Sequence, residues 1–346
     1  MNNSIVISTP PHVKSRRTTK GIMLDVVIAL LPAAIAGIVF FGWQALVIEI
    51  VSVASAVIAE FVYYFIYSGG FKNKCKNALG VCKNWVSQFD FTSIVTGLIL
   101  ALIVPSTINW YEVLIGAVFA IVIVKMLFGG TGRNLVNPAA AGRVMMFLSF
   151  ALTTYIAANI EPLSLDSQLF TGATHLSGFL LQGQTGAKMD WLDLFLGTGV
   201  AGCIGETCKL ALIIGYVYLV VRKVIKWWQP LLYIVLSAFL SVCLAATAEG
   251  ATFDISLIMD YALSGGLMFG AIFMATDYVT SPKGIYGQIV YYVALAVLTS
   301  LLRFYTKIEV VSFVILLMNL VVPLIDTYIV RKPFGYKREK KQKEDK

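Results

Sequence analysis

Residues 22–41 read IMLDVVIALLPAAIAGIVFF, and this stretch indicates the class of protein. Asp25 is the one charged side chain in a run that matches the roughly twenty residues an α-helix needs to cross a bilayer. We expect a membrane-spanning helix here, with Pro32 as a point of bending. Because the run is long enough to span, we expect it to stay in the chain and not to be removed as a signal peptide.

The whole chain has the composition of an integral membrane protein. Of its 346 residues, 58% are apolar and 13% are charged, and the mean hydropathy is +0.80. Soluble domains carry about 25% charged residues, so the composition excludes an ordinary soluble protein. Repeated apolar runs of this length favour a bundle of helices, in which the backbone is satisfied within each span.

The apolar runs predict an all-α polytopic membrane protein with about ten transmembrane helices. The five expected helices of the first half cover residues 22–41, 45–67, 91–104, 111–128 and 139–157. The second half begins with a bent glycine-rich piece at 191–205, followed by a sixth helix that ends near 221. The last four helices cover residues 231–248, 261–276, 286–302 and 310–330. Five helices in each half would make the halves inverted repeats. The third and eighth helices are both short, and paired short or broken helices indicate a binding site near the midplane of such folds. Two helices that are short by coincidence are the alternative.

Polar segments divide the chain into five parts. We expect a basic arm (1–21), a first five-helix half (22–157), a polar loop (158–190), a second five-helix half (191–330) and a charged tail (331–346). Basic clusters are also found in nucleic-acid-binding proteins, but in so apolar a chain they indicate the cytoplasmic side and no nucleic-acid partner. With both termini in the cytoplasm, four of the 27 Lys and Arg side chains fall elsewhere: Lys188, Lys209, Arg303 and Lys307. This orientation places the 158–190 loop outside the cytoplasm.

Within that loop stands Thr171-Gly172-Ala173-Thr174. A loop of this length in an otherwise apolar protein is usually functional or disordered. Gly172 and Ala173 leave the Thr174 hydroxyl accessible because they carry little or no side chain. A four-residue pattern is weak by itself, and Thr171 is the competing hydroxyl.

Several stretches resemble the NqrB/RnfD family of membrane subunits and together extend over essentially the whole chain. TGAT (171–174) is similar to the family's acceptor for flavin transfer, in which a threonine hydroxyl forms a phosphoester with FMN. The other matching stretches are His12 after Pro10-Pro11, IMLDVVIALLPA (22–33), FGWQAL (41–46), TGLILAL (96–102), GGTGRN (129–134) before NPA (137–139), GET (205–207) and ATDYVTSP (275–282). The short N-terminus favours the Rnf branch over NqrB proteins, which are typically longer there.

The resemblance implies a flavoprotein subunit of an ion-motive redox complex. Thr174 would carry covalent FMN, attached by a flavin transferase, and a second, non-covalent flavin, riboflavin, would bind among the helices near the cytoplasmic side. The complex would exchange electrons between ferredoxin and NAD while moving Na+ or H+ across the bacterial inner membrane, and this subunit alone would not turn over. Its partners would be membrane lipid and the other Rnf subunits, RnfA, RnfB, RnfC, RnfE and RnfG. The acceptor motif departs from the family's pattern at Gln168, where an acidic residue is usual, and at His175, where proline is common.

Polar residues beside the expected helix breaks are candidates for binding. Asn137, Glu206 and Asp277 lie where free backbone donors and acceptors collect, so we predict cofactor-binding roles for them. Asn137 and Asp277 also suit helix caps and turns. Glu60 lies deeper in its helix than the acids near helix ends, and a carboxylate isolated in lipid is costly. We therefore place Glu60 on a cation or proton route.

Several alternatives are open at this point. A quinone-reducing role like that of NqrB is the nearest, and a requirement for quinone would indicate it. A redox-free inverted-repeat channel or transporter predicts a colourless protein, and a passive scaffold predicts that Thr174→Ala leaves complex activity intact. The five cysteines fit no zinc spacing, and a contribution of Cys203 or Cys208 to an iron–sulfur centre is a minor alternative.

Overall fold

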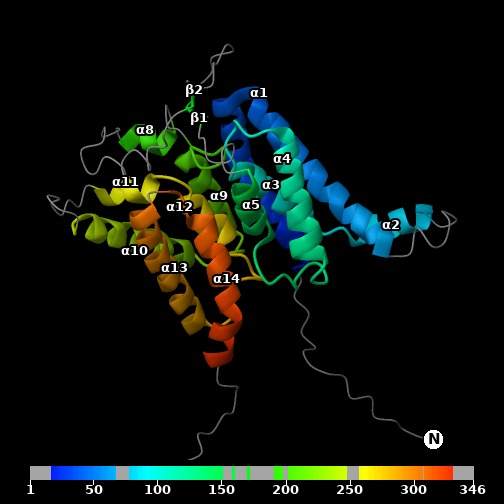
Figure 1. Ribbon diagram of the computed structural model, residues 1–346. Helices are drawn as coiled ribbons and strands as arrows, with labels where there is room; N and C mark the ends of the chain where they lie inside the picture. The colour runs from blue at the N-terminus through cyan, green and yellow to red at the C-terminus, as the bar shows by residue number, and fades with distance from the viewer. Residues whose placement is uncertain are drawn as a thin grey trace, which may run out of the picture.

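The structure is a computed structural model that describes most of the helical chain (Figure 1). The described residues are 17–67, 78–150, 158–159, 170–171, 191–197, 202–247, 257–306 and 308–329. Thr174 lies outside them, as do Gln168, His175, most of the arm 1–21 and the tail 331–346. A short antiparallel strand pair, β1 (Ala158–Asn159) and β2 (Phe170–Thr171), accompanies the helices.

The first helix, α1 (Thr19–Tyr67), accounts for two of the predicted crossings. A straight helix of its 49 residues would be about 74 Å long, against roughly 30 Å for the core of a bilayer. The helix is interrupted at Gly42, whose φ of 67° favours glycine. Figure 1 shows α1 turning back on itself at the top of the view. The predicted helices 22–41 and 45–67 are therefore confirmed, and the helical dihedral angles are interrupted at Gly42 and not at Pro32.

The other helices of the first half pack around α3 (Thr92–Leu102). α3 makes the most extensive helix contact in the described part, with α1, and most of its residues are buried. It follows α2 (Ala78–Gln88) at an angle of 67°, so the prediction of a short or broken third helix is confirmed. α4 (Trp110–Val118) continues directly into the π-helix η1 (Phe119–Met126), and α5 (Pro138–Ser149) follows.

The second half contains the same mixture of long and broken helices. Its elements are α8 (Trp191–Leu196), α9 (Lys209–Val221), α10 (Trp228–Ala245), α11 (Leu257–Leu263), α12 (Leu267–Phe269), the π-helix η3 (Gly270–Met274), α13 (Ile285–Thr306) and α14 (Val311–Tyr328). α11 and the continuous α12–η3 segment meet at 63°, so the predicted eighth helix is also short and broken. α9 packs closely against the first half of α1, because an added Cβ on Gly215 would lie 2.3 Å from Ala29 O.

The described helices have the length and surface of a membrane protein. Four of them (α1, α10, α13 and α14) are long and apolar enough to cross a bilayer, and the count is six if each bent pair is one span. Large apolar side chains cover the outside, and four that are more than half exposed are Ile35, Ile58, Val235 and Leu324. The chain is therefore an all-α, multi-pass membrane protein. Ten crossings and two inverted repeats stay predictions.

The helical part of the chain begins and ends at the same end of the bundle. Arg17, which precedes α1, donates from Nη1 to Lys223 O (3.4 Å), just after α9. Figure 1 shows α14 ending at this same, lower end. We call it the Thr19 end and the opposite end, where α1 turns, the Gly42 end. The arrangement agrees with an even number of crossings.

Gly97 is a point of close approach between α3 and α1. A Cβ at this position would lie 2.8 Å from Val53 Cα and 3.0 Å from Ser52 O. Because both are backbone atoms, Gly97→Ala should push the helices apart and lower the free energy of unfolding by about 1–3 kcal/mol. Thermal unfolding of the purified protein in detergent would show this as a lower Tm. Gly80→Ala is the matched control, since its added Cβ meets nothing within 4 Å; a Gly97→Ala protein as stable as this control would contradict the packing.

Candidate functional site

A cavity lies between the helices at the Thr19 end. It is bounded by α1, α3, η1, α5, α9 and η3 and has a cavity volume of about 90 Å³, within about 790 Å³ of empty space that includes open solvent. Cofactor and small-molecule pockets typically have volumes of roughly 300–1,000 Å³, so a ligand of that size would enter this cavity only if its walls moved apart. Its walls are largely apolar, and its polar lining residues are Thr92, Thr96, Lys125, Thr131, Asn134, Asn137, Thr276, Asp277 and Tyr278. Asn137 and Asp277, predicted from opposite halves of the chain, therefore meet here.

Asn137 connects the cavity wall to the start of α5. Its Oδ1 accepts hydrogen bonds from Ala139 N–H (3.0 Å) and Ala140 N–H (3.3 Å), so the helix-cap interpretation is confirmed. Its Nδ2 donates to Met274 O (3.3 Å) at the end of η3. Asn137 thus caps one helix and, in addition, joins the two halves of the chain at the cavity.

Asp277 follows η3 and closes a tight turn beside the cavity. Its Oδ1 accepts from Val279 N–H (3.4 Å) and its Oδ2 from the Thr280 hydroxyl (3.1 Å). Burial raises the pKa of the Asp277 carboxyl more than the hydrogen bonds from Val279, Thr280 and Tyr278 lower it. The predicted turn role is confirmed, and the ionised form of this carboxyl costs stability because it is desolvated.

Lys125 supplies a buried positive charge on the cavity wall. It lies in η1, and π-helical segments are frequent at functional sites. Its Nζ is 3.0 Å from Glu60 Oε1 and also donates to the Thr92 hydroxyl. The Lys125 side chain is 3% exposed and that of Glu60 is 13% exposed, so the pair is largely buried. Glu60 does not line the cavity; it lies behind Lys125, and its Oε2 has no hydrogen-bond partner among the described residues.

The start of α3 adds a second acid to this network. Asp90 Oδ1 accepts from Thr92 N–H (3.1 Å) and from the Thr92 hydroxyl (2.5 Å). Burial raises the pKa of the Asp90 carboxyl, but the hydrogen bonds from Thr92 and Thr131 and the charge of Lys125 together lower it below its usual range. Asp90, Thr92, Lys125 and Glu60 therefore form one connected polar network at the edge of the cavity.

Asn134 presents a free acceptor at the cavity. It lies in the glycine-rich turn that leads to α5, where Gly130 and Gly132 adopt positive φ values of 85° and 86° that suit glycine. Its Oδ1 is buried and has no hydrogen-bond partner in the described part of the chain. A buried acceptor without a partner is costly, so this atom is suited to receive a hydrogen bond from a ligand.

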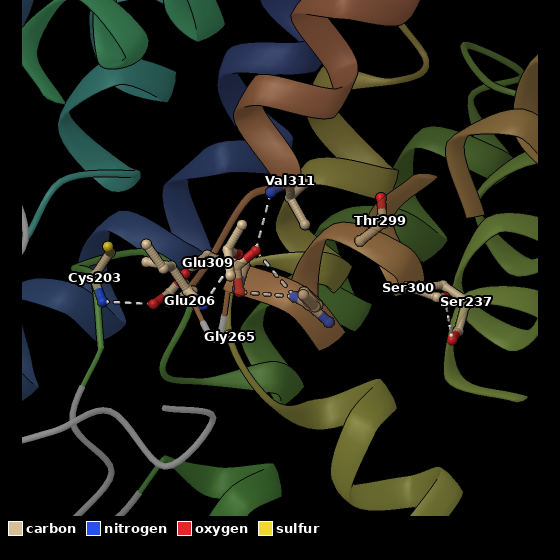
Figure 2. Close-up of polar contacts among 12 residues, drawn as sticks. Cys203, Glu206, Ser237, Gly265, Thr299, Ser300, Glu309 and Val311 are labelled. Atoms are coloured by element: carbon tan, nitrogen blue, oxygen red, sulfur yellow. Dashed lines mark hydrogen bonds and ion pairs between the residues drawn. The ribbon is translucent and has the colours of Figure 1, made fainter. Parts of the chain in front are cut away.

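Glu206 lies at the Gly42 end and not at the cavity. Figure 2 shows it beside Cys203. Its Oε1 accepts from Cys203 N–H (2.8 Å), and the neighbouring Gly205 N–H donates to Leu102 O (2.7 Å). Leu102 ends α3 whereas the cavity residue Thr92 begins it, so the two are about 15 Å apart along the helix. The structure therefore does not bring Glu206 together with the other two predicted cofactor-binding residues.

A second acid, Glu309, shares the Gly42 end with Glu206 (Figure 2). Its two carboxylate oxygens are 3.0 and 2.7 Å from Arg303 Nη2, and they also accept from Gly266 N–H (3.3 Å) and Val311 N–H (3.2 Å). Arg303 is 1% exposed, so this ion pair is buried like the one at the cavity. Across the described ranges, no group of three or more His, Cys, Asp or Glu side chains is suited to hold a metal ion.

The sequence predictions do not include Lys125, Asn134 or Glu309. Lys125 has a usable signal, because it is the one charged residue in the apolar run 119–128, and such residues are functional candidates by default. Asn134 is the last residue of the GGTGRN stretch (129–134), but that match does not indicate its role, which comes from the absence of a partner for Oδ1 among the described residues. Glu309 sits in a short turn between two apolar runs, where a solvated acid is the ordinary expectation.

Comparison with known proteins bears on the whole chain. The family model described as "NQR2, RnfD, RnfE family" matches residues 6–335. The chain belongs to this family. The D subunit of the Na(+)-translocating ferredoxin:NAD(+) oxidoreductase complex of Acetobacterium woodii is 37% identical over 98% of each chain. The D subunit of the proton-translocating ferredoxin:NAD(+) oxidoreductase complex of Clostridium ljungdahlii is 36% identical over 97% of this chain and 98% of its own.

More distant relatives carry a less specific name. The D subunit of the ion-translocating oxidoreductase complex of Alcanivorax borkumensis is 32% identical and aligns over 96% of this chain and 98% of its own length. The two more similar relatives are named for different ions, so similarity to them does not select between Na+ and H+. This member of the NQR2, RnfD, RnfE family thus matches the D subunits of such complexes over nearly its full length.

Removal of one partner of the Lys125–Glu60 pair should destabilise this family member strongly. Lys125→Met leaves Glu60 buried without its partner and should lower the free energy of unfolding by about 3–5 kcal/mol. The double variant Lys125→Met/Glu60→Gln should recover most of the loss, because neither charge is then left unpaired. Denaturation in detergent would measure both. Lys83→Met is the control, since it is the same change at an exposed lysine on α2, and it should cost less than about 1 kcal/mol. A loss for Lys125→Met no larger than this would contradict the pair's role.

Asp277 should make stability depend on pH in a defined direction. Its pKa is raised in the folded state, so the cost of ionising it appears as pH rises above the unfolded value of about 4. Asp277→Asn removes the charge and keeps a turn-forming side chain. We expect the variant to match the wild type at acidic pH and to be more stable as pH approaches neutrality, measured as Tm against pH. A difference in Tm that is the same at every pH would contradict the assignment.

Proposed function

We propose that this protein is the D subunit of an ion-translocating ferredoxin:NAD+ oxidoreductase complex. In this role it is a membrane flavoprotein subunit that carries FMN covalently on Thr174 and couples electron transfer to the movement of Na+ or H+. The observation that carries the proposal is similarity along almost the whole chain, at 37% identity over 98% of its length, to a relative with that name. The TGAT stretch at 171–174, which begins at the last residue of β2, supports the flavin assignment.

The cavity at the Thr19 end has lining residues that suit a second flavin, the riboflavin that the family resemblance implies, although its volume of about 90 Å³ requires the walls to move apart for such a ligand. A flavin ring has a broad apolar surface and a polar edge, and the cavity offers matching features. Ile99, Ile272 and Phe273 line it with apolar surface, and the buried Asn134 Oδ1 lacks a donor among the described residues. A flavin supplies transfer of one or two electrons when bound. Asn134 would hold the polar edge.

The residues of the cavity wall would place a positive charge beside a bound ligand and hold the surrounding backbone in position. Lys125 Nζ places a positive charge beside the ligand, and the partly buried Glu60 fixes the position of that charge through a 3.0 Å ion pair. Asn137 and Asp277 hold the backbone of the opposite wall, since they bind Met274 O and Val279 N–H respectively. The largely apolar surroundings keep water away and strengthen each of these electrostatic interactions.

The orientation follows from the basic residues at the two ends. Lys and Arg side chains gather at the Thr19 end, where Arg17, Lys20, Arg222, Lys223, Lys226 and Lys283 lie. An excess of Lys and Arg favours the cytoplasmic side, so we place both termini in the cytoplasm of a bacterial cell and the Thr174 loop outside the inner membrane. The partners are then the other subunits, RnfA, RnfB, RnfC, RnfE and RnfG, and a flavin transferase that reaches the loop from outside.

In-gel fluorescence tests the attachment of flavin to Thr174. The chain is co-expressed with a flavin transferase, denatured and separated, so that only covalently bound flavin fluoresces. We expect a fluorescent band for the wild type and for Thr171→Ala, and loss of the band for Thr174→Ala. Thr171→Ala is the matched control because it removes the neighbouring hydroxyl of the same motif. Fluorescence that persists in Thr174→Ala, or that disappears only in Thr171→Ala, would contradict the proposal.

A further inference from the structure

The second half of α1 carries two acidic side chains on one face. Glu49, Ser52, Ala56 and Glu60 recur at intervals of three or four residues, which places them along one side of a helix. Ser52 Oγ donates to Gly97 O (2.7 Å), so this face packs against α3 inside the bundle and does not face lipid. At about 1.5 Å of rise per residue, the two acids lie about 16 Å apart along the helix. The stripe therefore extends over about half of the roughly 30 Å core of a bilayer.

The two acids differ in what they contact. Glu60 pairs with Lys125 at 3.0 Å. Glu49 is 6% exposed, forms no ion pair among the described residues, and its Oε1 is buried without a hydrogen-bond partner there. A carboxylate in this position is costly in the membrane unless a proton or another cation binds to it. Glu49 is thus an acid in the interior of the bundle that no described residue neutralises.

The elements that pack against this part of α1 leave Glu49 without a positive charge. α3 has no ionisable side chain. α4 carries Glu112, whose Oε1 accepts from Asn109 Nδ2 (2.8 Å). Lys125 of η1 is engaged by Glu60 and Thr92. α2 carries the exposed Lys83 and contacts α1 near Phe61, one residue beyond Glu60 and three turns from Glu49.

We propose that Glu49 is a binding site for the transported cation, a proton or Na+, on a route along the second half of α1 toward Glu60. Binding of Na+ to the carboxylate oxygens displaces the carboxyl proton to solvent, so the charge of the site stays the same. In the proton case, the same oxygens take up and release H+. The Ser52 and Ser55 hydroxyls already donate to backbone carbonyls, which leaves their oxygens able to accept or to coordinate. The inference rests on the proposed function only for the statement that the bound ion is the one that the complex moves.

Labelling with N,N′-dicyclohexylcarbodiimide tests the site in the assembled complex. This apolar reagent reacts with protonated carboxyls in apolar surroundings. The carboxyl proton moves to a carbodiimide nitrogen, the carboxylate oxygen bonds to the central carbon, and an acyl shift to nitrogen gives a stable N-acylurea. Peptide mass spectrometry then reports modification at Glu49 and Glu60 separately. We expect Glu49 to be labelled and Glu60, whose carboxylate is paired with Lys125 at 3.0 Å, to be spared.

The conditions of labelling separate the two ions. Loss of the Glu49 label on addition of NaCl, but not of an equal concentration of choline chloride, indicates a Na+ site. A label that disappears with rising pH and is indifferent to NaCl indicates a proton site. Absence of the label in the folded complex, when the denatured chain is modified at Glu49, would overturn the proposal. None of these results depends on Thr174, so a failure of the flavin assignment leaves the labelling outcome readable.

Transport by variants of the complex provides the functional readout. In sealed vesicles, Glu49→Gln should cause loss of ion movement per NADH formed, because an amide neither releases a proton nor replaces a carboxylate as a charged ligand. Glu49→Asp should retain ion movement, since it keeps the ionisable group. A purely structural role for Glu49 would let the isosteric Gln variant move ions at the wild-type ratio, and that result would overturn the proposal. If Glu49→Gln does not assemble, Glu49→Asp provides the test. Its new carboxyl at position 49 should be labelled as Glu49 is in the wild type, and absence of that label would overturn the proposal.

Discussion

Backbone groups at the ends of broken helices must find partners within the protein, because the core of a bilayer offers no water to satisfy them. The two short central helices, α3 and η3, solve this problem in a reciprocal way. The carbonyl of Leu102, at the end of α3, accepts from Gly205 N–H of the second half (2.7 Å). The carbonyl of Met274, at the end of η3, accepts from Asn137 of the first half (3.3 Å). Each half of the chain thus completes the broken helix of the other, which is the relationship that two inverted repeats would have.

The polar groups of the protein collect at the two places where one half of the chain bonds to the broken helix of the other. At the Thr19 end, Asn137 at the start of α5 bonds to the end of η3. The cavity lies beside that junction, and Lys125 of the Lys125–Glu60 pair lines it. At the Gly42 end, the loop that completes α3 carries Glu206, and the neighbouring Glu309 is held by Arg303 (Figure 2). Both junctions contain a buried ion pair, and such pairs are weak sources of stability compared with apolar packing. Their retention inside a membrane bundle is better explained by function.

Much of the fold could be predicted from the sequence because a bilayer imposes simple rules on length and composition. The apolar runs predicted both halves of α1, and the short runs before Pro105 and Asp277 predicted the broken helices. α2 was not predicted, because its basic segment has no long apolar run and its position depends on ring contacts such as Phe61–Trp85 (5.1 Å between centroids). Of the candidate site, Asn137 and Asp277 could be named as polar residues at helix breaks. Their meeting at one cavity could not be predicted.

The sequence by itself determined that this chain crosses a membrane as helices and that its motifs resemble those of flavin-dependent ion-motive subunits, since length, hydropathy and local patterns are properties of continuous segments. Only the tertiary structure decided that Lys125 is paired with Glu60, that Glu206 lies apart from the cavity, and that Glu49 has no ion-pair partner among the described residues. Pairing and isolation of a buried charge depend on which helices face each other. That information lies in packing between segments distant in the sequence, and no local pattern contains it.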